Sequence, residues 1–387
     1  MAIGDMLVVD ADSHWSEPAD MFTSRAPEKY KDQVPHVELV DGQPSWVFNG
    51  IKVGMFAAGA VIAKDKTKSE DARVLTTWTT EDVHQGAYDP KVRVETLDES
   101  GIDHQVIFPS TIGLGGQDLG AVDDPVLKRV AVEIYNDGMA QIQEESGNRL
   151  LPMPLMPAYS VEECVREVKR CAALGLRGVN MTSDPQDLGA PDLASHDWDP
   201  FWEACSELQM PVHFHIGASL TAMTFFGNYS WASQKEATKL AIGGTLLFIG
   251  NARVVTNMIL AGIFDRHPDL QSVSVESGVG WIPFILETLD YEMNENARAD
   301  LAALKKPPSE YFKSNMYATF WFENNQNNLP ALIQSVGEDR ILFETDFPHP
   351  TCLYPSPLAS VQEKMKTLET STQAKIYGEN ARKLYRL

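Results

Sequence analysis

The stretch that decides the fold is Met6-Leu-Val-Val-Asp-Ala-Asp12, a short apolar run that ends in acidic residues. A run without regular polar alternation is typical of a strand buried on both faces of a parallel sheet. Seven further runs of this kind follow, at residues 104–109, 150–156, 176–181, 211–215, 271–276, 316–320 and 340–345. Helix-start signals such as Asp124-Pro125, Ser160 and Asp199-Pro200 lie between them. This alternation predicts an α/β fold, a (β/α)8 TIM barrel, with a doubly wound open sheet as the alternative.

One segment does not fit the alternation. Residues 15–95 separate the first two predicted strands, which is far longer than a usual connection between a strand and a helix. The segment contains Trp15, Trp46 and Trp78 and the turn signal Asp41-Gly42. In a barrel it would leave the C-terminal end of the first strand, where active sites lie. We therefore predict one domain, residues 1–387, in which 15–95 form an inserted cap or lid; the alternative is a peripheral or dimer-forming insertion.

The amino-acid composition argues against several classes of binding partner. Asp and Glu number 54 against 32 Lys and Arg, which gives a formal net charge of −22 and argues against nucleic acid or an anionic membrane as partner. No apolar run approaches the ~20 residues of a membrane helix, and the first residues do not resemble a secretory signal. The four cysteines form no Cys-x-x-Cys pair. A cytoplasmic protein that binds a small molecule is the simplest expectation, and a homo-oligomer is compatible with it.

Metal-binding residue types fall at the ends of the predicted strands. They are Asp12 and His14 after the first strand, His213 and His215 in the fifth, Glu276 at the end of the sixth, and Asp346 and His349 after the eighth. A barrel brings the C-terminal ends of all its strands to one mouth, so these residues should converge. Imidazoles with carboxylates suit a divalent transition metal that keeps a coordination position open for water.

The spacing of these residues along their strands distinguishes the better candidate ligands from the others. Alternate residues of a strand point to the same face, so Asp12 and His14 can both face the mouth, while Asp10 lies one layer deeper and is predicted to be a buried hydrogen-bonding partner. His215 ends its strand and is the better ligand of the two histidines. His213 remains open between a ligand, a second-layer donor and a satisfied core histidine.

Several segments in order resemble the amidohydrolase superfamily, specifically the amidohydrolase-related branch that includes aromatic-acid decarboxylases and carbon–carbon or ester hydrolases. The matching segments are residues 8–14, 91–103, 211–217, 343–350 and 377–385. The resemblance implies a catalytic divalent metal bound by Asp12, His14, His215 and Asp346. We expect one or two ions, and the mixed imidazole and carboxylate ligands suit zinc as the first choice, with iron or manganese as alternatives.

Two positions depart from the family pattern. The first-strand motif of the family is often His-x-His, and here it is Asp12-Ser-His14. Decarboxylases of the branch usually carry His-x-Gly after the sixth strand, where this chain has Glu276-Ser-Gly. A carboxylate can bridge two metals, which can hold a hydroxide and polarise a carbonyl. Glu276 is therefore predicted as a further metal ligand.

This departure favours a metal-dependent hydrolase. Metal-bound hydroxide would attack a carbonyl or acyl carbon in an ester, thioester, amide or carbon–carbon bond of an apolar or aromatic carboxylic derivative. The predicted catalytic residues are Asp346, which would accept the proton of the water, Glu276 and His349. The alternative is a metal-dependent nonoxidative decarboxylase of an aromatic acid, in which His349 or His213 would deliver the proton. The aromatic side chains predicted to line the mouth are Trp15, Trp46, Trp78, Phe320 and Trp321.

Overall fold

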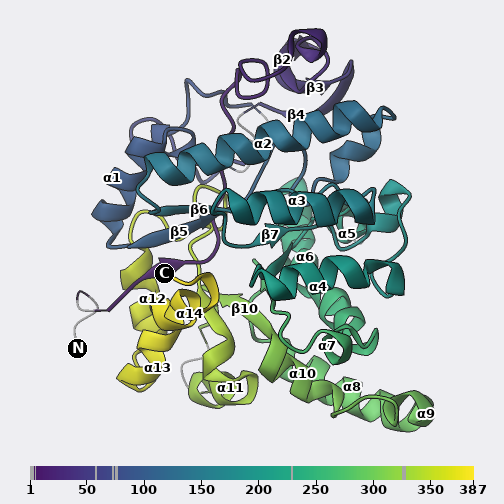
Figure 1. Ribbon diagram of the computed structural model, residues 1–387. Helices are drawn as coiled ribbons and strands as arrows, with labels where there is room; N and C mark the ends of the chain where they lie inside the picture. Colours follow the sequence, from purple (N-terminus) through teal and green to yellow (C-terminus); the bar gives the residue numbers. More distant parts are fainter. Residues whose placement is uncertain are drawn as a thin grey trace.

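Eight short parallel strands form the centre of the molecule (Figure 1). The computed structural model describes residues 4, 6–56, 59–71, 74, 77–227, 230–324 and 328–387. One arc contains β1 (Val9–Asp10), β5 (His104–Ile107) and β6 (Leu150–Pro152). A second arc contains β7 (Val179–Asn180), β8 (Val212–His215), β9 (Ser272–Val275), β10 (Met316–Phe320) and β11 (Ile341–Phe343). All eight predicted strands are present, each within its predicted range.

The two arcs meet at both edges. On one side, the amide of Ala11 donates to the carbonyl of Phe343 at 2.8 Å, and Ser13 forms a parallel bridge with Phe347. On the other, Leu155 forms a parallel bridge with Asn180. The strands therefore follow one another in chain order around a closed ring, as the predicted (β/α)8 barrel requires.

Helices separate the strands along the chain. They are α1 (Pro90–Ser100), α2 (Pro125–Glu145), α3 (Val161–Ala173), α4 (Asp199–Glu207), α5 (Leu220–Gly227), α6 (Glu236–Leu260), α7 (Ile263–Arg266), α8 (Ile282–Asn296), α9 (Arg298–Leu301), α10 (Pro308–Asn315), α11 (Leu329–Val336), α12 (Pro357–Met365), α13 (Thr370–Ala374) and α14 (Asn380–Tyr385). The predicted start signals are used: the Asp124 side chain accepts from the amides of the first turn of α2, and Ser160 does the same for α3.

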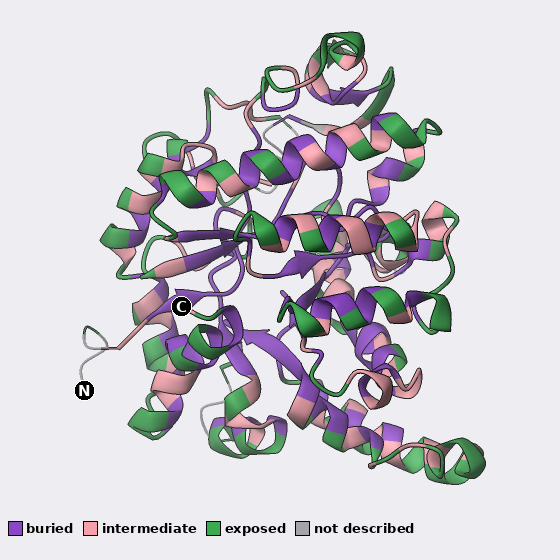
Figure 2. Ribbon diagram, viewed as in Figure 1, coloured by how far each residue is buried: buried purple, intermediate pink, exposed green. Residues whose placement is uncertain are grey.

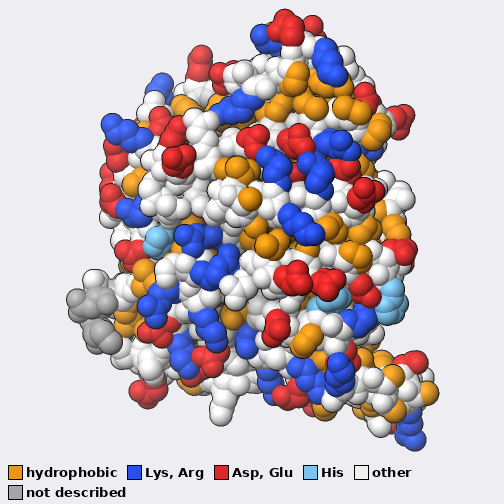
Figure 3. Space-filling view, in the orientation of Figure 1, with side chains coloured by type: hydrophobic (Ala, Val, Ile, Leu, Met, Phe, Trp, Pro, Cys, Tyr) orange, Lys and Arg blue, Asp and Glu red, His pale blue; other side chains and the backbone are white. Residues whose placement is uncertain are grey.

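Ion pairs connect neighbouring helices on the outside of the barrel. Arg166 on α3 lies 2.8 Å from Glu133 on α2, and Arg170 pairs with Asp137. Figure 3 shows basic (blue) and acidic (red) side chains interleaved on this face of the molecule. Exposed pairs contribute little stability individually, so burial of apolar side chains must supply most of it.

Burial divides the strand residues into two layers, because alternate side chains point inward and outward. The residues that fill the ring include Val9, Val106, Leu151, Val273 and Leu342. Their neighbours in sequence pack outward against the helices in a second, larger cluster. Figure 2 shows the barrel strands buried almost throughout, and the first residue of β5, His104, is half-buried. Only the ends of the strands are left to carry a site.

The insertion contains a feature that the sequence analysis did not anticipate. The strands β2 (His36–Val40), β3 (Gln43–Phe48) and β4 (Ile51–Met55) form an antiparallel sheet, which lies beyond α2 in Figure 1. The Asp41-Gly42 turn joins the first two of them. Residues 57, 58, 72, 73, 75 and 76 of the predicted cap lie outside the described residues.

Helix α6 qualifies the prediction that no segment could cross a membrane. It is 25 residues long. Its most apolar stretch has a mean hydropathy of 1.2, and 44% of that stretch is buried. By length and composition it could span a bilayer, but a helix packed on the core of a soluble protein passes the same test. The Asn251 side chain on α6 donates to the carbonyl of Phe214 in β8 at 3.0 Å, so the helix is attached to the barrel.

Candidate metal centre

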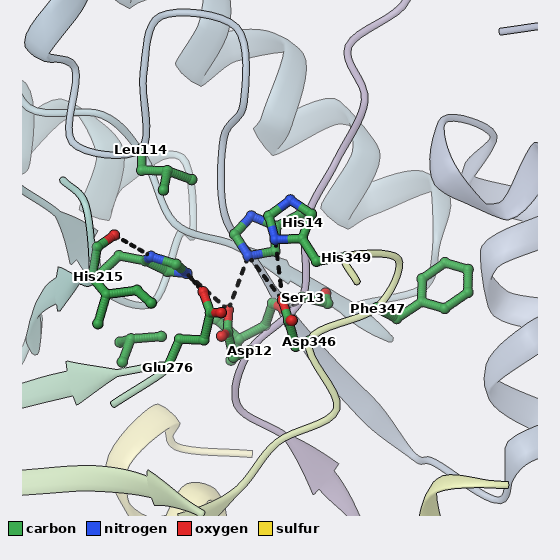
Figure 4. Close-up of polar contacts among 12 residues, drawn as sticks. Asp12, Ser13, His14, Leu114, His215, Glu276, Asp346, Phe347 and His349 are labelled. Atoms are coloured by element: carbon green, nitrogen blue, oxygen red, sulfur yellow. Dashed lines mark hydrogen bonds and ion pairs between the residues drawn. The ribbon is translucent and has the colours of Figure 1, made fainter. Parts of the chain in front are cut away.

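The predicted ligands converge at the C-terminal ends of the strands. Donor atoms of four side chains lie within 4.8 Å of one another: Asp12, His14, His215 and Glu276. A second group shares two of them and consists of His14, Glu276, Asp346 and His349. Figure 4 shows these side chains turned toward one centre from four different strand ends. The two groups together contain all the predicted ligand and catalytic residues except His213, whose role the sequence left open.

Short distances connect the members. The Nε2 atom of His14 lies 3.7 Å from Oδ1 of Asp12 and 3.4 Å from Oδ1 of Asp346. The Nε2 atom of His215 lies 3.4 Å from both Asp12 Oδ1 and Glu276 Oε2. These atoms are too close to be unrelated, yet most of the spacings exceed a normal hydrogen bond. A shared cation between them accounts for such spacing.

The donor atoms also lack other partners. Within the described part of the chain, both carboxylate oxygens of Asp12, both ring nitrogens of His14, Nε2 of His215 and Oδ1 of Asp346 are buried and make no hydrogen bond. Buried polar atoms are nearly always paired, because an unpaired one costs about 1–3 kcal/mol. Four of these atoms, Oδ1 of Asp12, Nε2 of His14, Nε2 of His215 and Oδ1 of Asp346, each lie within 3.7 Å of another of the four. Such a set of imidazole nitrogens and carboxylate oxygens fits a divalent metal.

His215 is held in the tautomer that a metal requires. Its Nδ1 lies 2.8 Å from the carbonyl oxygen of Ile216. A carbonyl can only accept, so Nδ1 carries the proton and Nε2 offers its lone pair to the centre. A backbone contact of this kind fixes the ring orientation of metal-binding histidines.

Burial and mutual repulsion shift the titration of the cluster. Burial, then the charge of Asp346, raises the pKa of both Asp12 and Glu276 well above the usual range. Burial lowers the pKa of His215 to about 4 and that of His14 well below its usual value. For Asp346, burial favours the neutral acid, but the neighbouring His349 and His14 outweigh it and lower the pKa. Burial thus disfavours the charged forms of Asp12, Glu276, His14 and His215, whereas the neighbouring histidines favour the ionised form of Asp346.

Two of the acidic residues have an unusual backbone. Glu276 has φ 54° and Asp346 has φ 58°, in the left-handed region that residues with a side chain seldom adopt. The amide of Asp346 donates to the carbonyl of Asp12 at 3.0 Å, which holds one of these residues in place. Such conformations concentrate at functional sites, because the surrounding structure must compensate for their cost.

His213 does not join the centre, which settles the question that its spacing left open. Its Nδ1 lies 2.9 Å from the Val179 carbonyl and its Nε2 lies 2.8 Å from the Tyr385 hydroxyl. It is therefore a satisfied core histidine one layer below His215. Asp10 lies at the same depth and bonds to Gln105 and Thr345, as predicted for a buried partner.

One acidic residue was missed. Glu344 is fully buried, and burial followed by the charge of Asp12 raises its pKa well above the usual range. The signal was present in the sequence, because Glu344 and Asp346 are two residues apart just after a strand, the spacing already used for Asp10 and Asp12.

The predicted aromatic lining is mostly wrong. Trp15, Trp46 and Phe320 are buried in the main core, and Trp78 packs against a small cluster around Val83. Their apolar surface is used for packing rather than for a pocket. Trp321 is buried as well, but it packs against the exposed Phe322 and against Phe248, with ring centroids 4.6 Å and 5.3 Å away, respectively. A side chain at Gly278, two residues after Glu276, would touch the Phe322 ring, so this aromatic group lies beside the centre.

Comparison with known proteins agrees with this geometry. The model of the amidohydrolase family matches residues 10–387. The chain belongs to the amidohydrolase family. It is therefore an enzyme of the amidohydrolase superfamily, and the fold, the metal-ligand types and the order of strand-end motifs agree with that membership.

Relatives of this amidohydrolase include two kinds of decarboxylase. A 2-amino-3-carboxymuconate-6-semialdehyde decarboxylase of Dictyostelium discoideum is 26% identical over 78% of this chain and 77% of its own length. A gamma-resorcylate decarboxylase of Polaromonas is 26% identical over 66% of this chain and 76% of its own.

Solved structures share the fold of this amidohydrolase. An amidohydrolase from Mycobacterium avium subsp. paratuberculosis has a TM-score of 0.76 at 21% identity, covering 98% of this chain and 99% of its own. A dihydroxybenzoic acid decarboxylase of Polaromonas, with bound manganese and an inhibitor, has a TM-score of 0.62 at 17% identity, covering 99% and 97%.

Proposed function

We propose that this amidohydrolase is a metal-dependent nonoxidative decarboxylase of an aromatic or conjugated carboxylic acid. The observation that carries the proposal is the likeness to decarboxylases over most of the chain, combined with buried and unpartnered donor atoms in Asp12, His14, His215 and Asp346. The hydrolase prediction rested on Glu276 alone, and the relatives favour the decarboxylase that was its alternative.

The four ligand residues define what the site would hold. Asp12, His14, His215 and Asp346 would bind one divalent ion, and manganese is a reasonable first choice because a decarboxylase of this fold binds it. The bound ion would act as a Lewis acid toward oxygen atoms of the acid substrate. Glu276, within reach of both ligand groups, would complete the coordination or orient the substrate.

Decarboxylation also needs a proton. When the bond between the ring carbon and the carboxylate breaks, its electron pair stays on the ring carbon, which must be protonated. We assign this role to His349, whose Nδ1 lies 3.2 Å from Oδ1 of Asp346 and whose side chain is 18% exposed. His349 can therefore exchange protons with solvent, whereas His213, the other candidate, has both nitrogens engaged in the core.

The site also offers a surface for a flat substrate. Phe248, Trp321 and Phe322 form an aromatic group beside Gly278, and Phe322 is 43% exposed. We propose that Phe322, the exposed member of this group, contacts the apolar face of the acid, with Trp321 packed behind it.

We propose that part of the 15–95 insertion covers the centre. The amide of Val61 donates to the carbonyl of Pro348 at 3.0 Å, and Gly59 lies against the His349 ring. Val61 and Ile62 also pack on Phe347 and Cys352. Residues 59–62 would thus exclude water above the reacting carbon, which suits a reaction whose intermediate needs one controlled proton.

The test is product analysis in labelled water. Protein loaded with Mn²⁺ is incubated with 2,6-dihydroxybenzoate and 5-carboxyvanillate, the acids named for related structures, and with further hydroxylated benzoic acids. We expect release of carbon dioxide and, in D₂O, one deuterium on the ring carbon that carried the carboxylate. Release of no carbon dioxide from any acid, together with cleavage of aryl esters that incorporates oxygen-18 from water, would assign hydrolysis instead.

Hydrolysis stays the second candidate because of one specific residue. Glu276 stands where decarboxylases of the branch usually carry histidine, and its carboxylate lies 3.4 Å from Nε2 of His215. A carboxylate there suits activation of water better than delivery of a proton to carbon.

A further inference from the structure

The side chain of Arg93 is buried beside the metal centre although it is not a candidate ligand. It projects from α1, at the end of the insertion, and has no exposed surface. We propose that Arg93 is a positioning residue for the metal ligands, which fixes His14 directly and Asp12 and Asp346 through Gln105 and Asp10. The proposal rests on the metal-dependent function proposed above.

The guanidinium binds the backbone of a ligand. Its Nη2 donates to the carbonyl of His14 at 2.6 Å, and its Nη1 donates to Oε1 of Gln105 at 2.8 Å. Its Nε donates to the carbonyl of Gly86, which ties the group to the insertion. All three acceptors are neutral, so the charge is used to hold atoms in place rather than to form an ion pair.

The same group lies between the two segments that carry ligands. The guanidinium carbon is 5.5 Å from the centre of a Trp15 ring and 4.5 Å from that of Phe347. Trp15 follows His14 and Phe347 follows Asp346, and the amide of His14 donates to the carbonyl of Phe347 at 2.7 Å. A displacement of Arg93 would therefore move both segments together.

A second route runs through Gln105 and Asp10. Gln105 Nε2 donates to Oδ2 of Asp10 at 2.7 Å. The Oδ1 atom of Asp10 accepts from the amides of Asp12 at 3.2 Å and Thr345 at 2.8 Å. One of these amides belongs to a ligand, and the other to the residue before the ligand Asp346. The hydrogen-bond chain thus ends on both sides of the centre.

The geometry requires arginine rather than any cation. A planar fork of donors reaches the His14 carbonyl and Gln105 at the same time, whereas an ammonium on a flexible stem is a point charge. Residues that orient metal ligands in this way typically change metal affinity about 10–100-fold when they are replaced. Arg93→Lys therefore keeps the charge and removes the fork.

The experiment compares Arg93→Lys with Arg340→Lys. Arg340 is a matched control, because it lies before β11 at the opposite end of the barrel, where it contacts the Tyr317 ring and Gln271. Each protein is freed of metal and titrated with Co²⁺ alone, whose visible absorption reports the ligand geometry. Circular dichroism and melting temperature verify the fold.

We expect Arg93→Lys to bind Co²⁺ about 10–100-fold more weakly than the wild type, with a shifted absorption spectrum. Arg340→Lys should match the wild type in both. A role in general stability alone would lower the melting temperature and leave the spectrum of the bound ion unchanged. A folded Arg93→Lys protein with wild-type affinity and spectrum would overturn the proposal.

Gln105→Leu provides a second variant in case the lysine protein does not fold. It leaves the bond from Arg93 to His14 and breaks only the route to Asp10, so weaker Co²⁺ binding and a spectral shift are again expected. Wild-type behaviour of this variant would then refute the proposal. Failure of the proposed function looks different, because wild-type protein would bind Co²⁺ normally and release no carbon dioxide from any acid.

Discussion

The imidazole rings of His14 and His349 are stacked, with centroids 3.5 Å apart and planes 19° from parallel. One ring belongs to the first strand end and the other to the loop after the last strand. Because Asp346 lies within 3.4 Å of both, the two rings and this carboxylate form one unit (Figure 4). His349 is the member of this unit that reaches solvent.

His349→Asn should separate proton transfer from metal binding. We expect decarboxylation to fall about 100-fold or more, the usual contribution of a general acid, because the ring carbon loses its proton donor. The metal content should stay at the wild-type value, since the four proposed ligands remain. His196→Asn is the control, because that side chain is 76% exposed and pairs with Asp199 rather than with any proposed ligand. Elemental analysis and carbon dioxide release measure the two effects, and an active His349→Asn protein would refute the assignment.

His215→Asn should remove one of the proposed ligands and so prevent tight binding at the proposed metal site. The contact with the Ile216 carbonyl keeps the proton on Nδ1 of His215, so Nε2 presents its lone pair to the centre. We expect metal affinity to fall more than about 100-fold, beyond the loss typical of residues behind the ligands. Retention of a full complement of metal, measured by elemental analysis after dialysis, would contradict the proposed ligand set.

Glu276→Gln distinguishes the two candidate reactions. The amide removes the negative charge and keeps the shape, while Asp12, His14, His215 and Asp346 remain to bind the ion. Hydrolysis that depends on this carboxylate should fall about 100-fold or more. Decarboxylation through His349 should fall less than tenfold. A tenfold change represents roughly 1.4 kcal/mol of activation free energy, so Glu276 would contribute less than this to decarboxylation. Initial rates for both classes of substrate decide between these outcomes.

Gly59→Ala tests whether the insertion covers the centre. A methyl group there would come within 2.4 Å of Nε2 of His349, and the φ of +90° at Gly59 disfavours any side chain. We expect turnover to fall about tenfold or more as His349 is displaced, with the metal content unchanged. Gly244→Ala in α6, where nothing lies within 4 Å of the new methyl group, should keep wild-type turnover. Equal rates for the two variants would argue against a covering role.

The folded state should lose stability in mild acid. Burial lowers the pKa of His213 to about 4, from an ordinary value of 6.5, so the unfolded chain takes up a proton that the native state refuses. The contribution of neutral His213 to the free energy of unfolding is fully present above about pH 6.5. It is lost as the pH falls toward 4, by up to about 1.4 kcal/mol per pH unit.

Urea unfolding of wild type and His213→Asn between pH 4.5 and 7 measures this effect. The variant should be less stable at neutral pH, with a pH slope smaller by about one proton. Parallel slopes for wild type and His213→Asn would show that His213 titrates normally.

The barrel could be predicted because each of its strands corresponds to a short apolar run in the sequence. Each apolar run marks a strand whose two faces are both buried, and the Asp124 and Ser160 caps mark where helices begin. The strand ends then identify the candidate ligands Asp12, His14, His215, Glu276 and Asp346, which the structure brings together but which remain a prediction as ligands. The β2–β4 sheet was missed, although the Asp41-Gly42 turn indicated a hairpin.

Other features depend on side-chain packing, which spacing cannot reveal. Trp15 and Phe320 were expected at the mouth and are buried in the core, because an aromatic residue near a strand end has the same local pattern in either place. His213 and His215 share a strand face and differ only in depth, which is set by Tyr385 from the far end of the sequence. The cytoplasmic location and a homo-oligomer remain predictions.

The bridge between Ser13 and Phe347 closes the ring of strands beside the proposed metal site. Because Asp12 and Asp346 come from the two segments that meet at this seam, their donor atoms come together only when the barrel has closed. Binding of a cation would therefore be coupled to closure of the barrel. In metal-free protein, amide hydrogen exchange should be faster at this seam than in the rest of the barrel.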